Sequence, residues 1–76
     1  MKQESLSLSD FLKDKRKKSD LTQQQLALKA GVGLRFVRDL EQGKTTLRMD
    51  KVNQVLNMFG HELQPQPVDR NKNQDR

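Results

Sequence analysis

The sequence lacks cysteine, tryptophan and tyrosine, and it contains one histidine, His61. Without cysteine the chain can form neither disulfides nor thiolate metal sites, a composition compatible with the reducing cytoplasm in which we expect the protein to act. A lone histidine excludes most zinc arrangements and leaves no obvious Ser-His-Asp triad, and we find no paired carboxylates and no glycine loop that would cradle a phosphate. We therefore expect no metal site, no cofactor and no enzymatic activity.

Apolar residues are also scarce, making up 32% of the 76 residues. This length suits one small domain near the lower limit for folding alone. Its core must be thin, so we expect a partner chain, forming a homodimer, to bury further surface. No apolar run is long enough for a membrane span or a signal peptide, so we expect no membrane partner.

Positive charge is what the sequence has in excess, with a net charge of +5. A basic chain suits a polyanionic partner, although a basic surface often serves only solubility. Five of the six residues from Lys13 to Lys18 are basic. They would lie at the C-terminal end of a helix, where cations interact favourably with the helix dipole. We favour this interpretation over a dedicated phosphate patch.

Apolar residues recur at helical spacing in four segments, which predicts an all-α fold, a small bundle of four to five helices. The expected helices cover about 7–18, 23–30, 34–42 and 47–59, the first capped by Ser7 and the last by Thr46. Alternation over 61–64 suggests a short C-terminal strand, and Pro65 and Pro67 forbid a helix beyond it. We expect a folded domain over 7–64, a flexible segment over 1–6 and a disordered tail over 65–76.

The stretch from Thr22 to Gly43 contains the clearest motif. Thr22 is a good N-cap, and Gly31 is the residue expected where a helix ends with a positive φ. A second helix starts near Leu34 and ends before Gly43. Two short helices joined by a tight glycine turn form a helix-turn-helix, in which the second helix enters the major groove of double-stranded DNA.

The apolar stripe of that second helix leaves long guanidinium side chains on its outer face. Arg35 and Arg38 lie there one turn apart, and arginine forms bidentate hydrogen bonds with the edge of guanine. Asp39, four residues after Arg35, is placed to orient that guanidinium. We predict that four residues contact the bases: Leu34, Arg35, Arg38 and Asp39. The alternative is a helical bundle in which these arginines only solvate a face.

From about residue 7 to residue 60 the chain resembles the Xre-type (phage repressor and Cro) helix-turn-helix family. Matching residue types carry this resemblance, namely Gln23, Ala27, Gly31, Val37, Leu40 and the Glu-Gln-Gly-Lys that follows. The resemblance implies that the start of the second helix and the loop after the third lie on the DNA backbone. The implied phosphate contacts are Gln23, Lys44, Thr45 and Arg48. The resemblance also implies that Arg16 pairs with Glu41 and clamps the first helix to the third.

The stretch from Gly31 to Leu63 is similar, more narrowly, to the HipB-type antitoxins. That resemblance implies a dimeric repressor of its own promoter, bound to a palindromic operator, with a short strand after the last helix paired across the dimer. It also implies a second partner, a HipA-like kinase toxin or a split version of one, which the antitoxin holds inactive. Two alternatives remain. One is a free-standing regulator with the same DNA chemistry, and the other is a module whose basic helix binds an acidic protein or membrane surface.

Overall fold

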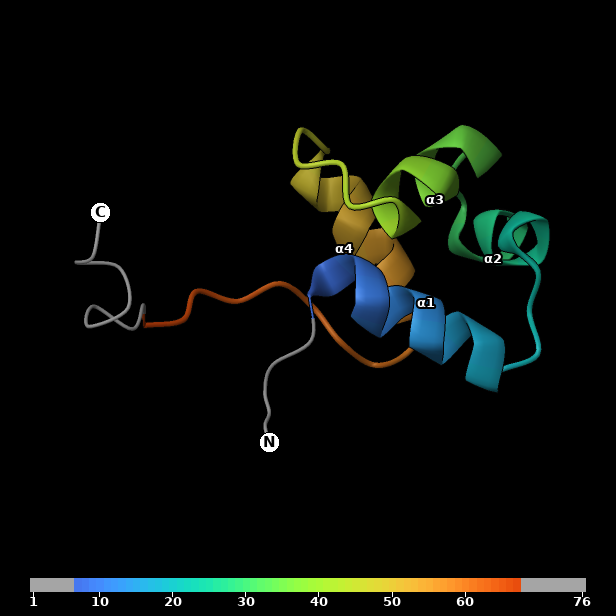
Figure 1. Ribbon diagram of the computed structural model, residues 1–76, viewed down its shortest axis with the longest axis horizontal. Coiled ribbons are helices and arrows are strands. Elements are labelled where there is room, and N and C mark those ends of the chain that lie inside the picture. The colour runs from blue at the N-terminus through green and yellow to red at the C-terminus, as the bar shows by residue number, and fades with distance from the viewer. Residues whose placement is uncertain (1–6, 68–76) are drawn as a thin grey trace.

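The predicted all-α fold is confirmed by a computed structural model, which describes residues 7–67. Within this range the chain forms four helices: α1 (Leu8–Lys18), α2 (Gln23–Ala30), α3 (Leu34–Glu41) and α4 (Met49–Asn57). Figure 1 shows α2 and α3 next to each other, with α1 crossing in front of α4. Residues 1–6 and 68–76, for which the sequence predicts a flexible segment and most of a disordered tail, lie outside the described residues.

The first two helices begin where hydroxyl side chains satisfy free backbone amides. The Ser7 hydroxyl accepts a hydrogen bond from the Asp10 amide at 3.2 Å. Thr22 and Gln25 form a capping box: the Thr22 hydroxyl accepts from the Gln25 amide at 3.0 Å, and the Gln25 side chain accepts from the Thr22 amide at 2.8 Å. Each cap satisfies a donor that has no partner within the helix, which holds the helix start in place.

The fourth helix is shorter than predicted at both ends. It begins at Met49 after an N-cap at Arg48, so the prediction of Thr46 as its cap is wrong. Leu47 is half-buried against the core from non-helical chain, and apolar spacing alone does not distinguish this placement from a first helical turn. At the other end, Met58, Phe59 and the glycine after them form a turn with bonds three residues back.

All four helices end in the same way. A residue with positive φ follows each helix, and the next amide bonds to the carbonyl five residues earlier, which is the Schellman arrangement. These closing bonds are Leu21 to Arg16 at 3.1 Å, Val32 to Ala27 at 3.0 Å, Lys44 to Asp39 at 3.1 Å and His61 to Leu56 at 3.0 Å. The positive-φ residue is a glycine after α2, α3 and α4, but it is Asp20 after α1, with a φ of 59°. Left-handed backbone strains an aspartate more than a glycine, although less than most residue types.

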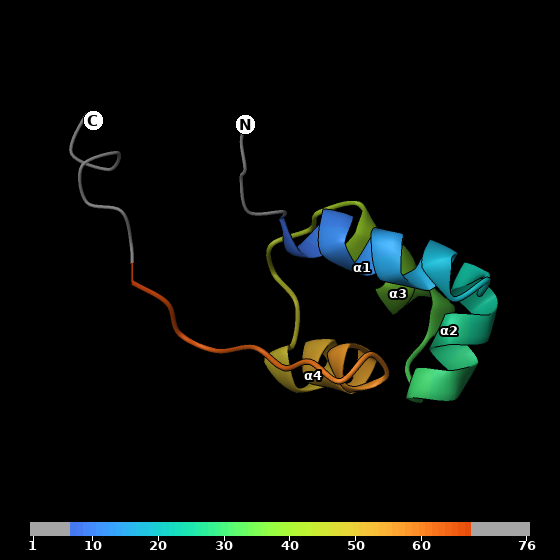
Figure 2. The same ribbon diagram turned by 90° about the horizontal axis from the view of Figure 1, so that it is seen from below.

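The core is small and lies where the helices converge. Its buried side chains come from all four helices: Leu12, Leu26, Ala27, Val37, Leu40, Val52, Val55 and Leu56. α3 packs against both α1 and α2, and α4 packs against α2. In Figure 2, α1 and α4 lie on opposite sides of the bundle with α2 at one end. Because Ala27 is small, α2 and α3 can approach closely, and that contact sets the geometry of the turn between them.

The predicted strand near 61–64 does not form among the described residues. The chain from His61 to Pro67 is neither helix nor strand. It is held instead by side chains: the Leu63 amide donates to the Asn53 side-chain oxygen at 2.7 Å, and the His61 ring meets the edge of the Phe11 ring at 4.9 Å between centroids. A strand needs a neighbouring strand to bond its backbone, and residues 7–67 provide none.

None of the helices within residues 7–67 is long and apolar enough to cross a bilayer.

Asp20 provides a test of the helix-ending motif. Asp20→Gly should raise the free energy of unfolding by about 0.5–1 kcal/mol, because it removes left-handed strain and a carboxylate from the C-terminal end of α1. Ser19→Gly is the matched control, since Ser19 has a φ of −92° and gains nothing from glycine. Urea denaturation of both variants measures the difference. Equal effects at the two positions would contradict the assignment.

Candidate nucleic-acid interface

The turn between α2 and α3 is held from the side by α4. Gly31 takes a φ of 77°, and the Gln54 side chain on α4 donates to the carbonyls of Ala30 at 3.1 Å and Gly31 at 3.4 Å. Sequence analysis did not predict this contact, because Gln54 is far along the chain and lies at an exposed helical position. The turn angle is therefore fixed both by its own backbone and by the last helix.

α3 divides into a buried face and an exposed face. Val37 and Leu40 are buried in the core, while Arg35 and Arg38 are exposed. The Arg35 side chain keeps 87% of its surface in solvent. The helix is thus anchored by one face and presents two long cationic side chains on the other. Leu34, another of the predicted base contacts, lies at the start of the helix. It is half-buried and packs against the core.

Asp39 lies between two of the predicted DNA contacts. Its carboxylate Oδ1 is 3.4 Å from Nε of Arg35, and its Oδ2 is 3.7 Å from Nζ of Lys44. The Asp39 side chain is 20% exposed, so it is more enclosed than either cation. One carboxylate therefore links the outer face of α3 to the loop that follows it.

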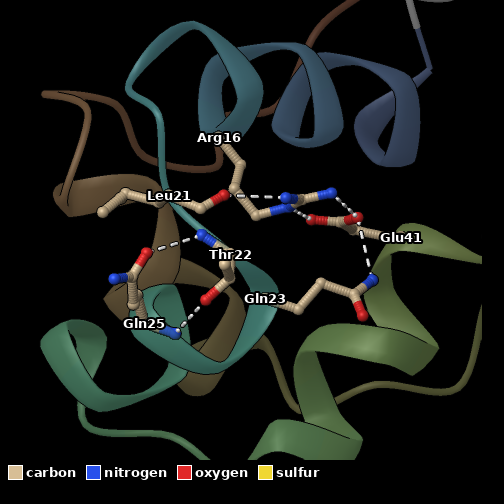
Figure 3. Close-up of polar contacts among 6 residues, drawn as sticks. All are labelled: Arg16, Leu21, Thr22, Gln23, Gln25 and Glu41. Carbon is tan, nitrogen blue, oxygen red and sulfur yellow. Dashed lines mark hydrogen bonds and ion pairs between the residues drawn. The ribbon is translucent and has the colours of Figure 1, made fainter.

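Arg16 and Glu41 form a two-pronged ion pair between α1 and α3. Nε of Arg16 donates to Oε2 of Glu41 at 2.6 Å, and Nη2 donates to Oε1 at 3.1 Å. The remaining Nη1 donates to the Leu21 carbonyl at 2.8 Å, in the link between α1 and α2. Figure 3 shows the guanidinium between Leu21 and Glu41. Arg16 thereby connects three parts of the fold.

Gln23, at the start of α2, joins the same network. Its amide nitrogen donates to Oε1 of Glu41 at 3.1 Å (Figure 3). Because a carboxylate only accepts, this bond requires the amide nitrogen, not its oxygen, to face Glu41. The second N–H of that nitrogen is not used in the bond. The structure thus places a predicted phosphate contact beside the Arg16–Glu41 pair and fixes its orientation.

Glu41 is an almost fully buried carboxylate, with 5% of its surface exposed. Burial alone raises the pKa of Glu41, but the hydrogen bonds from Arg16 and Gln23, together with the nearby charges of Arg16 and Lys13, outweigh that effect. The pKa of Glu41 therefore lies below its usual value, and the carboxylate stays ionised. The contribution of Lys13 was not expected from the sequence, which assigned that basic run to the helix dipole.

The loop before α4 places the other predicted phosphate contacts in solvent. Lys44, Thr45 and Arg48 are all exposed. Arg48 turns back toward α4, where Nε and Nη2 meet the two Asp50 oxygens at 3.2 and 2.7 Å. This pair lowers the pKa of Asp50 and raises that of Arg48. In the free protein, therefore, the guanidinium of Arg48 is already occupied by a neighbour.

Two short helices at a fixed turn, with a basic outer face on the second, define a helix-turn-helix protein. The sequence pattern described as "Helix-turn-helix" matches residues 12–64, and the chain belongs to this family, in its Xre-like form. The chain is also 56% identical over 45 residues to a protein of Sinorhizobium fredii named "Uncharacterized HTH-type transcriptional regulator y4mF". The aligned region covers 59% of each of the two chains. The predicted family is thus confirmed.

The Arg16–Glu41 pair should be coupled energetically. Arg16→Ala and Glu41→Ala should each lower the free energy of unfolding by about 3 kcal/mol, because each strands a buried charge. The double variant should lose less unfolding free energy than the two single variants added together, by at least about 1 kcal/mol. Urea denaturation measures all three. Glu41→Gln replaces the alanine variant if the latter is unfolded in water.

The matched control for this cycle is an exposed pair on α1. Lys18 and Asp14 lie 3.2 Å apart with most of the lysine side chain in solvent, so their coupling should stay below about 0.5 kcal/mol. Additive effects of Arg16→Ala and Glu41→Ala would contradict the proposed clamp.

Proposed function

We propose that this protein is a sequence-specific DNA-binding transcriptional regulator, acting as a dimeric repressor. The observation that carries this proposal is the division of α3, in which buried Val37 and Leu40 anchor the helix while Arg35 and Arg38 project from the opposite side. A rigid helix with outward guanidinium groups matches the width and the hydrogen-bond acceptors of the major groove. The name of the Sinorhizobium fredii relative, an HTH-type transcriptional regulator, supports the same conclusion.

The predicted contacts fall into two groups, base contacts and phosphate contacts, according to where they lie on this surface. Arg35 and Arg38 on α3 are proposed to contact base edges, with Leu34 at the helix start and Asp39 orienting Arg35. Gln23, Lys44, Thr45 and Arg48 are proposed to contact phosphates. The second N–H of the Gln23 amide supports this role for Gln23, because the bond to Glu41 leaves it unused. Arg48 lies 2.7 Å from Asp50, closer than the 3.7 Å between Lys44 and Asp39, so its contribution should be smaller than that of Lys44.

Two copies of the chain are proposed to bind a palindromic operator. One domain offers few base contacts, and a two-fold dimer doubles them with half-sites about one helical turn apart. A groove of about 370 Å³ supports the dimer: its lining includes Leu8, Leu47, Met49 and Leu63, next to the loop of Lys44 and Thr45. The Met49 side chain at its edge is 68% exposed. A second copy covering this groove would bury apolar surface that the thin core leaves in solvent.

A narrower form of the proposal is that the protein is the antitoxin of a HipA-like kinase toxin, or of a split toxin. It is supported by the similarity of residues 31–63 to the HipB-type pattern. The alternative is a free-standing Xre-type regulator. Purification of the chain at its native expression level decides between them, because an antitoxin should bring a kinase-like protein with it and a free-standing regulator should not.

Arg35 and Lys44 should differ in what they contribute to binding. On a duplex selected from a random pool by the wild-type chain, Arg35→Ala should cost about 1–3 kcal/mol, and on scrambled DNA it should cost little. Lys44→Ala should weaken both duplexes alike and lower the salt slope by about one. Titrations across a salt series, with Arg38→Ala alongside, measure both quantities. If Arg35→Ala weakens the two duplexes equally, Arg35 is a phosphate contact.

The groove beside Met49 should control dimer formation. Met49→Glu should shift the chain from dimer to the 8.8 kDa monomer, because it places a charge in the proposed interface. Leu28→Glu is the matched control: Leu28 is 77% exposed on α2, away from the groove, and the variant adds the same charge. Sedimentation at micromolar concentration measures both. A wild-type chain that is monomeric with and without DNA would contradict the dimer.

A further inference from the structure

The loop after α3 brings a second cation to Asp39. Gly43 takes a φ of 86°, and the Lys44 amide closes onto the Asp39 carbonyl at 3.1 Å. This backbone bond places the start of the Lys44 side chain directly beside Asp39. The 3.7 Å approach of Lys44 Nζ to Asp39 Oδ2 therefore follows from the way the helix ends and does not depend on the conformation of a distant loop.

Asp39 is an unfavourable charge to carry at a DNA-facing position. Non-specific affinity for DNA depends on how many phosphates the protein neutralises, and each cation held by a carboxylate counts less toward that number. Asp39 faces both Arg35 and Lys44, so three charged groups there sum to a single positive charge. A carboxylate at this place also repels any phosphate that approaches either cation.

A contact between Arg35 and the correct base does not incur this loss of affinity. The closest approach of the Arg35 guanidinium to Asp39 is made by Nε, which lies 3.4 Å from Oδ1. Arg35 can then hold Asp39 with Nε while its terminal nitrogens bond the O6 and N7 atoms of guanine. On non-cognate DNA, where Arg35 has only phosphates to contact, a phosphate competes with Asp39 for Arg35 as well as for Lys44. The carboxylate is therefore tolerated on the right base and opposed on DNA backbone alone.

We propose that Asp39 is a specificity-determining residue that weakens binding to non-cognate DNA by holding Arg35 and Lys44. This inference rests on the proposed DNA-binding function and adds to it a repulsive element at the same surface. It assigns to Asp39 a role toward two side chains of its own protein, in addition to the predicted role toward a base.

The test compares Asp39→Asn with the wild-type chain on selected and scrambled duplexes. Asp39→Asn should raise affinity for the scrambled duplex by about tenfold more than for the selected one, and it should steepen the salt slope on scrambled DNA by about one. Asp14→Asn is the matched control, because Asp14 also faces a lysine four residues away and its loss changes the net charge equally. That control should leave the ratio of the two affinities at its wild-type value.

Each outcome of this experiment has a separate meaning. A wild-type chain without any preferred duplex would overturn the proposed function, and this inference with it. A wild-type chain that discriminates, beside an Asp39→Asn variant that discriminates equally well, would overturn the inference alone. An equal change of the ratio in Asp14→Asn would assign the effect to net charge and would also overturn it. Thermal unfolding of both variants checks that the fold is retained.

Discussion

The buried ion pair between Arg16 and Glu41 is the constraint on which the rest of the structure depends. Glu41 ends α3 inside the protein, and an ionised carboxylate there is stable only with donors around it. Those donors come from α1 and from the start of α2, through Arg16 and Gln23. One carboxylate thus sets the position of α3 relative to both helices that precede it.

This constraint explains how a thin core holds a defined surface. Residues 7–67 contain eight buried apolar residues, too few for side-chain packing alone to fix the positions of the helices. Hydrogen bonds are directional, so the Arg16 guanidinium, which also bonds the Leu21 carbonyl, specifies angles that apolar contacts leave free. The Gln54 contact to the turn acts in the same way from α4. Polar contacts therefore set much of the relative orientation of the helices, while burial of the small apolar core stabilises the folded state.

The parts of this fold that could be predicted from the sequence are local. The caps at Ser7 and Thr22 and the left-handed residue after α2 depend on neighbours a few positions away, so residue type and spacing reveal them. The start of α4 could not be located, because Leu47 reaches the core equally well from extended chain. The strand predicted near 61–64 does not form in the single chain, because pairing depends on a neighbouring strand that residues 7–67 do not contain. The pairing of Arg16 with Glu41 came from family resemblance, since 25 residues separate them.

The side chains of α3 that fill the core and the two arginines that meet solvent are different residues, although Leu34 at the helix start packs against the core as well. Val37 and Leu40 carry the core, while Arg35 and Arg38 contribute nothing to it. Replacing the outer residues should therefore leave the scaffold as stable as before, within the small range typical of surface changes. Under the proposed function, substitutions at these two exposed positions would alter the contacts with DNA while the core residues of α3 stay unchanged. Gln23 differs from these two arginines, because its side chain also bonds the buried Glu41 and a substitution there would change the scaffold itself.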